Sequence, residues 1–413
     1  MLISKNFLLW LLIVTYPFAI YQLDVFSMNL RLNDAVIFFA FSMLLITSLT
    51  TNFLPMPNLL AIGALMIIFS GLFSELINQN FDIFSLKGVF RYLFFFLSAY
   101  ILSWLITPVN LDFVDSLVIK VSIFIAATIL VQQLAYVLFD FKWLYPFCNF
   151  LSCADVAYND NHGAWGYAGG FMRPPAFFTS LNYSGLFLVP ALLSLYGRML
   201  LGEKKAKALF LFIFIALLLS LSKNALVAFL IAILFFALKF YRFSLSFLGV
   251  TAFFGALIFG LMIFLEIEII LKLSAQLELW LSHIQSSTVV MIENYGFGLG
   301  FQKYDPYVFE AGMVEKYGSH NNFISTFGDT GIIGIIGFLL PIFFLLILVK
   351  KSLYFLKSTR LDKNFILFLA YSSSFAGIFA AGLIRTYYLN FWSVLIFTIA
   401  LSYYKVLKSG VKR

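Results

Sequence analysis

Residues 319–338 read "SHNNFISTFGDTGIIGIIGF" and join a polar cluster to a glycine-dotted apolar helix. The second half opens an apolar run at 328–349, and such a run is long enough to cross a bilayer core, about 20 residues. His320 in the first half has two interpretations. It faces a wet external cavity, where a neutral imidazole accepts a proton or donates a hydrogen bond. Alternatively it only helps to begin the helix, as Ser319, Asn321 and Asn322 can do equally well.

Apolar runs of this kind recur along the whole chain. Of its 413 residues 62% are hydrophobic and 11% are charged, a composition typical of an integral membrane protein. We expect a single transmembrane domain over 1–413 with about twelve spans. The expected spans are 6–23, 35–52, 57–79, 88–107, 116–139, 180–197, 208–222, 224–240, 246–265, 328–349, 365–384 and 388–406. Solid runs without alternation exclude an outer-membrane barrel, so an all-α polytopic bundle is the predicted fold class.

The distribution of basic residues predicts the orientation. The first run follows one lysine and lacks a small-residue cleavage site, so it is expected to stay as an anchor. Lysine and arginine concentrate in 198–207, 239–242, 350–363 and 405–413, which the positive-inside rule assigns to the cytoplasm together with both termini. This bias explains the net charge of +8, so no nucleic-acid partner is needed.

Two long connections, 140–180 and 266–327, fall on the predicted external side. They are rich in aromatic residues and glycine, which indicates structured, functional loops. The first contains both cysteines, Cys148 and Cys153. An oxidising compartment would permit a disulfide between them, and two free thiols are the alternative. The second begins with a stretch, 266–285, predicted to be an amphipathic helix at the membrane surface.

Several basic residues break the inside rule and are expected near the outer leaflet. They are Lys87, Arg91, Arg173, Lys223 and Arg385. Lys87 and Arg91 are four residues apart and therefore share one helical face. Cations gathered at membrane depth indicate an anionic ligand, and a pyrophosphate on a lipid tail fits because guanidinium groups bind its oxygens bidentately. The alternative for each is snorkelling to headgroups or pairing with an acid.

The remaining histidines, and the lack of metal-binding motifs in the sequence, limit the kinds of site that can be expected. His162 lies in a glycine-rich turn and could bind ligand, whereas His283 is expected to be interfacial packing. Scattered histidines without paired cysteines or carboxylates do not predict a zinc site. No DxD metal site or phosphate-cradling loop is present in the sequence, so neither a metal nor a cofactor is expected.

The polar cluster carries a family resemblance. His320-Asn321 is followed by nine residues, Gly331, two more residues and Gly334. This arrangement resembles the motif of the bacterial O-antigen polymerase and O-antigen ligase (Wzy/WaaL) superfamily, and it falls at the end of the last long external loop.

Three further stretches resemble that family. "RPPAFFTSLNYSGLFL" places Arg173 and Asn182 at an external Arg and a following Asn. "SLSKNALVAFLIA" places Lys223 where the family has Arg, which keeps the charge but loses the bidentate fork. "ENYGFGLGFQKY" resembles a Gly-x-Gly element at 296–300. The resemblance covers roughly 170–340, and the arginine that many members carry in the final external loop is replaced here by lysines. These lysines are Lys272, Lys303 and Lys316.

The resemblance implies a GT-C-like, inverting, metal-independent glycosyltransferase. Its donor would be a glycan on undecaprenyl pyrophosphate at the periplasmic face of the bacterial inner membrane. An acceptor hydroxyl would attack the anomeric carbon with help from His320, and undecaprenyl pyrophosphate would leave. The pyrophosphate-binding residues implied are Arg173, Lys223, Arg91, Arg385 and Lys87, and the supporting residues are Asn321, Asn182, Gly331 and Gly334. Membrane lipids and a chain-length regulator are the further partners expected.

Four functions are weighed. A polymerase, which is favoured, adds the glycan to another lipid-linked repeat, and an O-antigen ligase transfers it to the lipid A core. A lipid-linked oligosaccharide flippase, or another transporter, is expected to hold its cations in a central cavity. A purely structural membrane subunit would need no cationic cluster.

Overall fold

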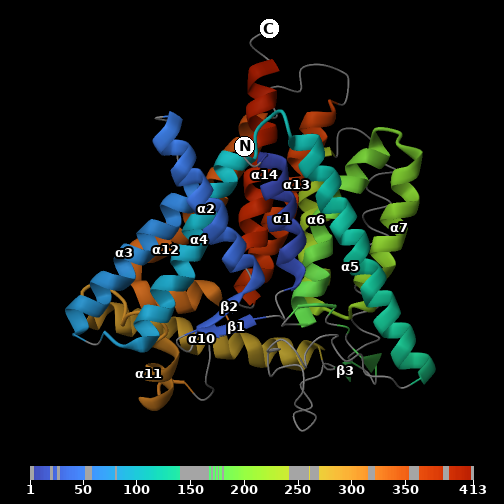
Figure 1. The fold of residues 1–413 in the computed structure, drawn as a ribbon. Coiled ribbons are helices and arrows are strands. Elements are labelled where there is room, and N and C mark those ends of the chain that lie inside the picture. The colour runs from blue at the N-terminus through green and yellow to red at the C-terminus, as the bar shows by residue number, and fades with distance from the viewer. Residues whose placement is uncertain are drawn as a thin grey trace.

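The computed structural model is built almost wholly of helices (Figure 1). The structure describes residues 4–18, 22–25, 28–51, 58–79, 81–139, 167–168, 171–172, 174, 176–178, 181–240, 260, 269–314, 321–352, 362–384 and 390–410. The first helices are α1 (Lys5–Thr15), η1 (Tyr16–Phe18), α2 (Leu32–Thr51), α3 (Leu59–Asn78), α4 (Ile83–Leu105), α5 (Leu111–Phe139), α6 (Leu181–Leu200), α7 (Lys204–Leu219) and α8 (Lys223–Phe240). The later helices are α10 (Ile269–Glu293), α11 (Tyr304–Glu310), α12 (Asn322–Ser352), α13 (Lys363–Ile384) and α14 (Phe391–Gly410). Two short antiparallel hairpins pair β1 (Gln22–Val25) with β2 (Met28–Arg31) and β3 (Tyr167–Ala168) with β4 (Phe171–Met172).

Eight helices among the described residues are long and apolar enough to cross a membrane: α2 to α6 and α12 to α14. Each of them overlaps an expected span, which confirms a helical, multi-pass architecture. Helices α1 and α8 are apolar but shorter. The expected span at 246–265 lies almost wholly outside the described residues, so the total of about twelve spans stays a prediction.

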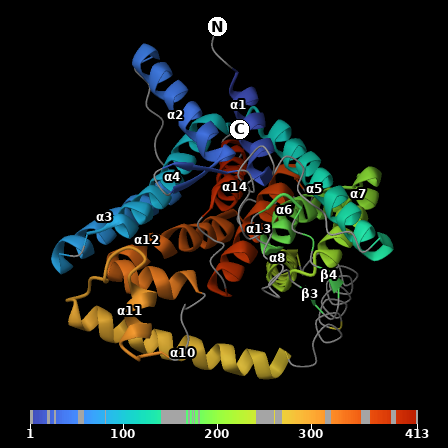
Figure 2. The same cartoon turned by 60° about the horizontal axis from the view of Figure 1, so that its bottom comes forward.

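The helices define two ends of the bundle. At what we call the terminal end, α1 begins and α14 finishes (Figure 1). Contacts place further helix ends there: Lys5 Nζ donates to the carbonyl of Trp104 at 2.9 Å, and Lys363 Nζ lies 2.8 Å from an oxygen of Asp112. The opposite end, the loop end, carries the β1–β2 hairpin, α11 and α10, which crosses beneath the bundle instead of running along it (Figures 1 and 2).

A buried acid joins three helices near the terminal end. Asp115 of α5 is fully buried and accepts hydrogen bonds from Ser194 Oγ of α6 and Tyr371 Oη of α13, both at 2.6 Å. Arg198 of α6 completes an ion pair with the same carboxylate. A buried charge is tolerated when it is paired and hydrogen-bonded in this way. The network therefore explains an acid inside an apolar bundle without a catalytic role.

Helices α3 and α12 cross closely at two glycines. A Cβ on Gly63 or on Gly337 would clash with the carbonyl oxygen of the other, and small residues at such positions let membrane helices approach. Farther along α12 the backbone leaves the helical conformation at Gly331, where φ is 67° and ψ is −155°. This break lies at the loop end, next to α11 and the segment before it.

Candidate functional site

At the break in α12, backbone from another part of the chain supplies the hydrogen-bond partners that the helix itself lacks. The N–H groups of Leu299 and Gly300 donate to the carbonyls of Gly328 and Asp329 at 3.0 and 2.9 Å, and the N–H of Ile332 donates to Gly296 at 3.1 Å. Non-helical backbone at membrane depth is stable only where protein supplies such partners. We call residues 296–304, together with Ser74, Glu75 and Asn78 of α3 and Asp329 of α12, the loop clamp.

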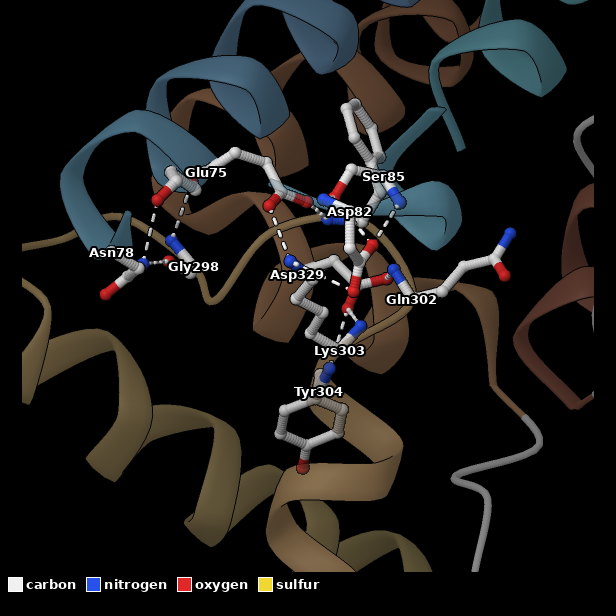
Figure 3. Close-up of polar contacts among 11 residues, drawn as sticks. Glu75, Asn78, Asp82, Ser85, Gly298, Gln302, Lys303, Tyr304 and Asp329 are labelled. Carbon is white, nitrogen blue, oxygen red and sulfur yellow. Dashed lines mark hydrogen bonds and ion pairs between the residues drawn. The ribbon is translucent and has the colours of Figure 1, made fainter. Parts of the chain in front are cut away.

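Asp329 holds the second half of that segment. Its carboxylate accepts the backbone N–H groups of Gln302, Lys303 and Tyr304 at 3.1, 3.2 and 3.0 Å (Figure 3). These groups lead into α11, whose N-cap residue Lys303 makes no side-chain capping bond. Asp329 thus caps α11 from a different helix, where a negative charge is favoured by the helix dipole.

Glu75 holds the same segment from α3. Its carboxylate is 1% exposed and accepts the N–H of Phe301 at 2.8 Å, and its other oxygen lies 2.7 Å from Lys303 Nζ (Figure 3). Asp82, which caps α4, lies 3.7 Å from the same ammonium group. Lys303 is therefore neutralised by two carboxylates, and it is not available to replace the arginine that the family resemblance leads one to expect in this loop.

The Gly-x-Gly element is needed for this docking. A Cβ on Gly298 would clash with the backbone of Asp329, and a Cβ on Gly300 would clash with the Glu75 carboxylate. Gly300 also has a φ of 108°, which side chains of L-residues rarely adopt. The element predicted from sequence is thus a docking element, with glycines where the loop touches α3 and α12.

Next to the clamp, α4 presents the two predicted cations on one face. Phe95, Ser98 and Leu102 continue the face of Arg91 at helical spacing, and all three are buried. Arg91 itself is exposed and Lys87 is half-buried. This face is therefore buried towards the terminal end and becomes more accessible at the loop end, where Arg91 is exposed.

The cations of α4 and the clamp are neighbours. Gly88 follows Lys87 and has no side chain because the ring of Phe301 occupies that space. The rings of Tyr92 and Phe301 are 5.6 Å apart. The clamp and the cationic part of α4 thus border one region at the loop end.

The motif residues that the structure describes have architectural roles. Asn321 is buried, and its Oδ1 accepts the N–H groups of Phe323 and Ile324 at 2.8 and 3.3 Å, so it caps α12. Gly331 supplies the break, since its positive φ and the nearby carbonyl of Gly296 exclude a side chain. A Cβ on Gly334 would clash with the Thr330 side chain.

Lys223 and Asn182 lie at helix starts. Lys223 is the half-buried first residue of α8, directly after the tight turn that ends α7, and Asn182 lies in the first turn of α6. The other predicted residues, namely His320, Arg173, Arg385, His162, Cys148 and Cys153, lie outside the described residues. Their convergence and the disulfide remain predictions.

His283 is enclosed within the protein. It is fully buried in α10, where Tyr304 of α11 donates its hydroxyl to the His283 carbonyl at 2.5 Å and lies 3.4 Å from Nδ1. Burial raises the pKa of the Tyr304 hydroxyl, so it remains a neutral donor. This contact joins α10 to α11. His283 therefore packs inside the protein, and not at the membrane interface where the sequence placed it.

A small cavity lies between η1, α6, α13 and the start of α14. Its volume is about 10 Å³, room for one water molecule. The residues that line it are Tyr16, Tyr183, Leu186, Phe187, Ile378, Asn390 and Trp392. Among the described residues, no group of three or more His, Cys, Asp or Glu side chains is arranged to hold a metal ion.

Neither the protein-family models nor the curated proteins compared with this chain include a match. The functional conclusion therefore rests on the residues themselves. Sequence reasoning passed over Glu75 and Asp329, although each is an acid inside an apolar run. Such acids are costly in a membrane segment and usually have a partner, and that cost was the signal that could have found them.

Proposed function

We propose that this protein is an inverting, metal-independent glycosyltransferase that polymerises undecaprenyl-pyrophosphate-linked repeat units at the periplasmic face of a bacterial inner membrane. The proposal begins from the resemblance over 170–340. The observation that carries it is the α4 face, where the exposed Arg91 and the half-buried Lys87 lie at the loop end beside the clamp. A cation pair at that position suits an anionic lipid headgroup.

In this proposal, different residues at the loop end perform different steps of the reaction. The cations of α4, with Lys223, Arg173 and Arg385, would neutralise the charge that develops on the departing pyrophosphate. His320, one residue before the Asn321 cap, would accept the proton of the attacking sugar hydroxyl. The clamp anchors both ends of the segment 304–328, which contains His320, and so limits the positions that the histidine can take.

The proposal is tested in a strain that lacks the gene and is complemented with variants. We expect His320→Ala and Arg173→Ala to leave single-repeat glycans, because each removes a group that acts on the reacting centre. Lys205→Ala, which changes an exposed cation at the terminal end, is the control and should restore long chains. Normal long chains with both loop-end variants would refute the assignment of the site.

An O-antigen ligase is the second candidate, because the His320 motif is complete in its spacing. A ligase shares the donor but delivers the glycan to the lipid A core. The same strain separates the two, since loss of a ligase leaves long chains on undecaprenyl pyrophosphate and none on the core. A flippase is less well supported, because the described cations of α4 lie at one end of the bundle and not along its interior.

A further inference from the structure

Helix α10 buries polar side chains on its inner face, beside the apolar Val290, and exposes apolar side chains on its outer face. The face packed on the protein contains His283, Ser286 and Ser287, which are 0%, 6% and 1% exposed. The opposite face carries Leu281, Ile284 and Ile292, which are 58%, 44% and 67% exposed. These apolar residues share one side of the helix, on which Thr288 lies one turn from both Ile284 and Ile292. We call this set the α10 outer stripe.

Such a helix does not suit water on its outer side. A helix at a protein–water boundary turns its apolar face inward and its polar face outward, and contiguous exposed apolar surface marks contact with a partner or a membrane. The residues flanking the stripe, Glu278 and Glu293, are exposed and charged. An apolar stripe bordered by charges, on a helix that crosses the axis of the bundle (Figures 1 and 2), is typical of a helix in the plane of a membrane interface.

The α10 outer stripe leads into the apolar surface of the membrane-crossing helices. After Ile292 the chain passes through Gly296, and a Cβ there would lie 3.4 Å from the terminal carbon of Ile332 on α12. The next residue, Phe297, packs against Phe73 of α3, with ring centroids 5.0 Å apart and the rings tilted by 45°. Ile332 and Phe73 are 45% and 49% exposed on helices that are long enough to cross the bilayer. The surface that such helices expose to hydrocarbon thus continues onto α10.

We propose that α10 is an interfacial helix whose outer stripe enters the hydrocarbon edge of the leaflet at the loop end. The occupant of this surface is lipid, because the stripe continues the apolar outer surface of α3 and α12. Its inner face, joined to α11 through Tyr304, then fixes the clamp at the depth of the lipid headgroups. This inference goes beyond the proposed function and does not depend on it.

The test uses the full chain in nanodiscs of phosphatidylethanolamine and phosphatidylglycerol. Cys148 and Cys153 are replaced by serine, and single cysteines at Leu281, Ile284 or Ile292 carry a nitroxide label. Power saturation then compares collision rates with oxygen, which partitions into lipid, and with a water-soluble nickel chelate. Glu310→Cys, on the exposed end of α11, is the control for a position in water.

We expect the ratio of oxygen to nickel collisions to be several-fold higher at all three stripe positions than at Glu310. Nickel collisions equal to those at Glu310 would overturn the proposal. Dipolar broadening between labels would also overturn it, because the stripe would then contact a second copy of the chain. Quenching of a bimane label on the same cysteines by brominated lipid gives a second readout, and an unchanged melting temperature confirms that each variant is folded.

Discussion

Asp329 shows how one side chain can organise a helix break. It lies two residues before Gly331, and its carboxylate supplies the acceptors that the first N–H groups around α11 would otherwise lack. Without it, three backbone donors at the loop end would depend on water. The sequence motif contains this residue within its nine-residue gap, where nothing in the spacing identifies it.

We expect Asp329→Ala to lower the free energy of unfolding by roughly 2–4 kcal/mol, since hydrogen bonds to charged groups contribute about 1.5–3 kcal/mol each and water replaces part of them. Asp329→Asn keeps an oxygen acceptor and should lose less. The measurement is the thermal unfolding of purified protein in detergent, with Glu310→Gln as the control for an exposed acid. Equal stability of the Ala variant and wild type would show that the carboxylate does not hold α11.

Gly331 and Gly312 differ in what a side chain would cost. Both have a φ near 67°, but Gly331 has a ψ of −155°, a conformation that is essentially confined to glycine. A Cβ on Gly331 would also meet the Gly296 carbonyl and Phe297, whereas Gly312 has open space. We expect Gly312→Ala to cost roughly 1 kcal/mol from the left-handed conformation, and Gly331→Ala to cost roughly 3 kcal/mol or more. Thermal unfolding checks both, and similar losses would mean that the contact with Gly296 is unimportant.

At the scale of elements, the clamp joins helices that are distant in the sequence. Glu75 and Lys303 form an ion pair that connects α3 to the start of α11, although they are 228 positions apart in the sequence. Glu75 is almost fully buried, so the pair needs both members. Removing Lys303 leaves the buried charge of Glu75 uncompensated, at a cost of about 3–5 kcal/mol, whereas Lys303 without Glu75 keeps Asp82 3.7 Å away.

We expect Lys303→Met to lower the melting temperature strongly and Glu75→Gln to lower it less, because Asp82 still lies near Lys303. The double variant should be more stable than the sum of the two losses predicts. The reason is that the double variant leaves no buried charge without a partner. Thermal unfolding of the four proteins completes the cycle. Additive losses would indicate that the two side chains do not interact in the membrane-embedded protein.

Much of this level of structure could be predicted from the sequence. The apolar runs located α2 to α6 and α12 to α14, because helices in a membrane must satisfy their backbone internally. The four-residue spacing of Lys87 and Arg91 placed them on one face of α4. The break in α12 could not be found in this way, since 328–349 reads as one uninterrupted apolar run. The Glu75–Lys303 ion pair could not be predicted either, because the two residues are far apart in the sequence and meet only in the folded protein.

The whole molecule has two chemically different ends. The terminal end has the basic first turn of α7, at 204–207, and the basic last turns of α14. The loop end has the clamp, α10 and α11 (Figure 1). The positive-inside rule assigns the terminal end to the cytoplasm, which predicts that the loop end, with Lys87, Arg91 and Lys223, faces the opposite side of the membrane.

We expect this orientation to be visible by cysteine labelling in intact cells. In a background without Cys148 and Cys153, Glu310→Cys should react with a membrane-impermeant maleimide added outside. Lys408→Cys near the finish of α14 should react only after the membrane is permeabilised. The reverse pattern would invert the topology and remove the periplasmic site.

The central claim is that the loop end holds a diphosphate on a lipid tether. Its most direct test is the binding of undecaprenyl pyrophosphate to purified protein, with neutral polyprenol as the comparison ligand. We expect the Lys87→Gln/Arg91→Gln double variant and Lys223→Gln each to weaken pyrophosphate binding by about tenfold or more, roughly 1.4 kcal/mol, and to leave polyprenol binding unchanged. The Lys205→Gln/Lys207→Gln variant, which removes the same charge at the terminal end, should bind like wild type. Undiminished binding by both loop-end variants, or an equal loss in the terminal-end variant, would contradict the claim.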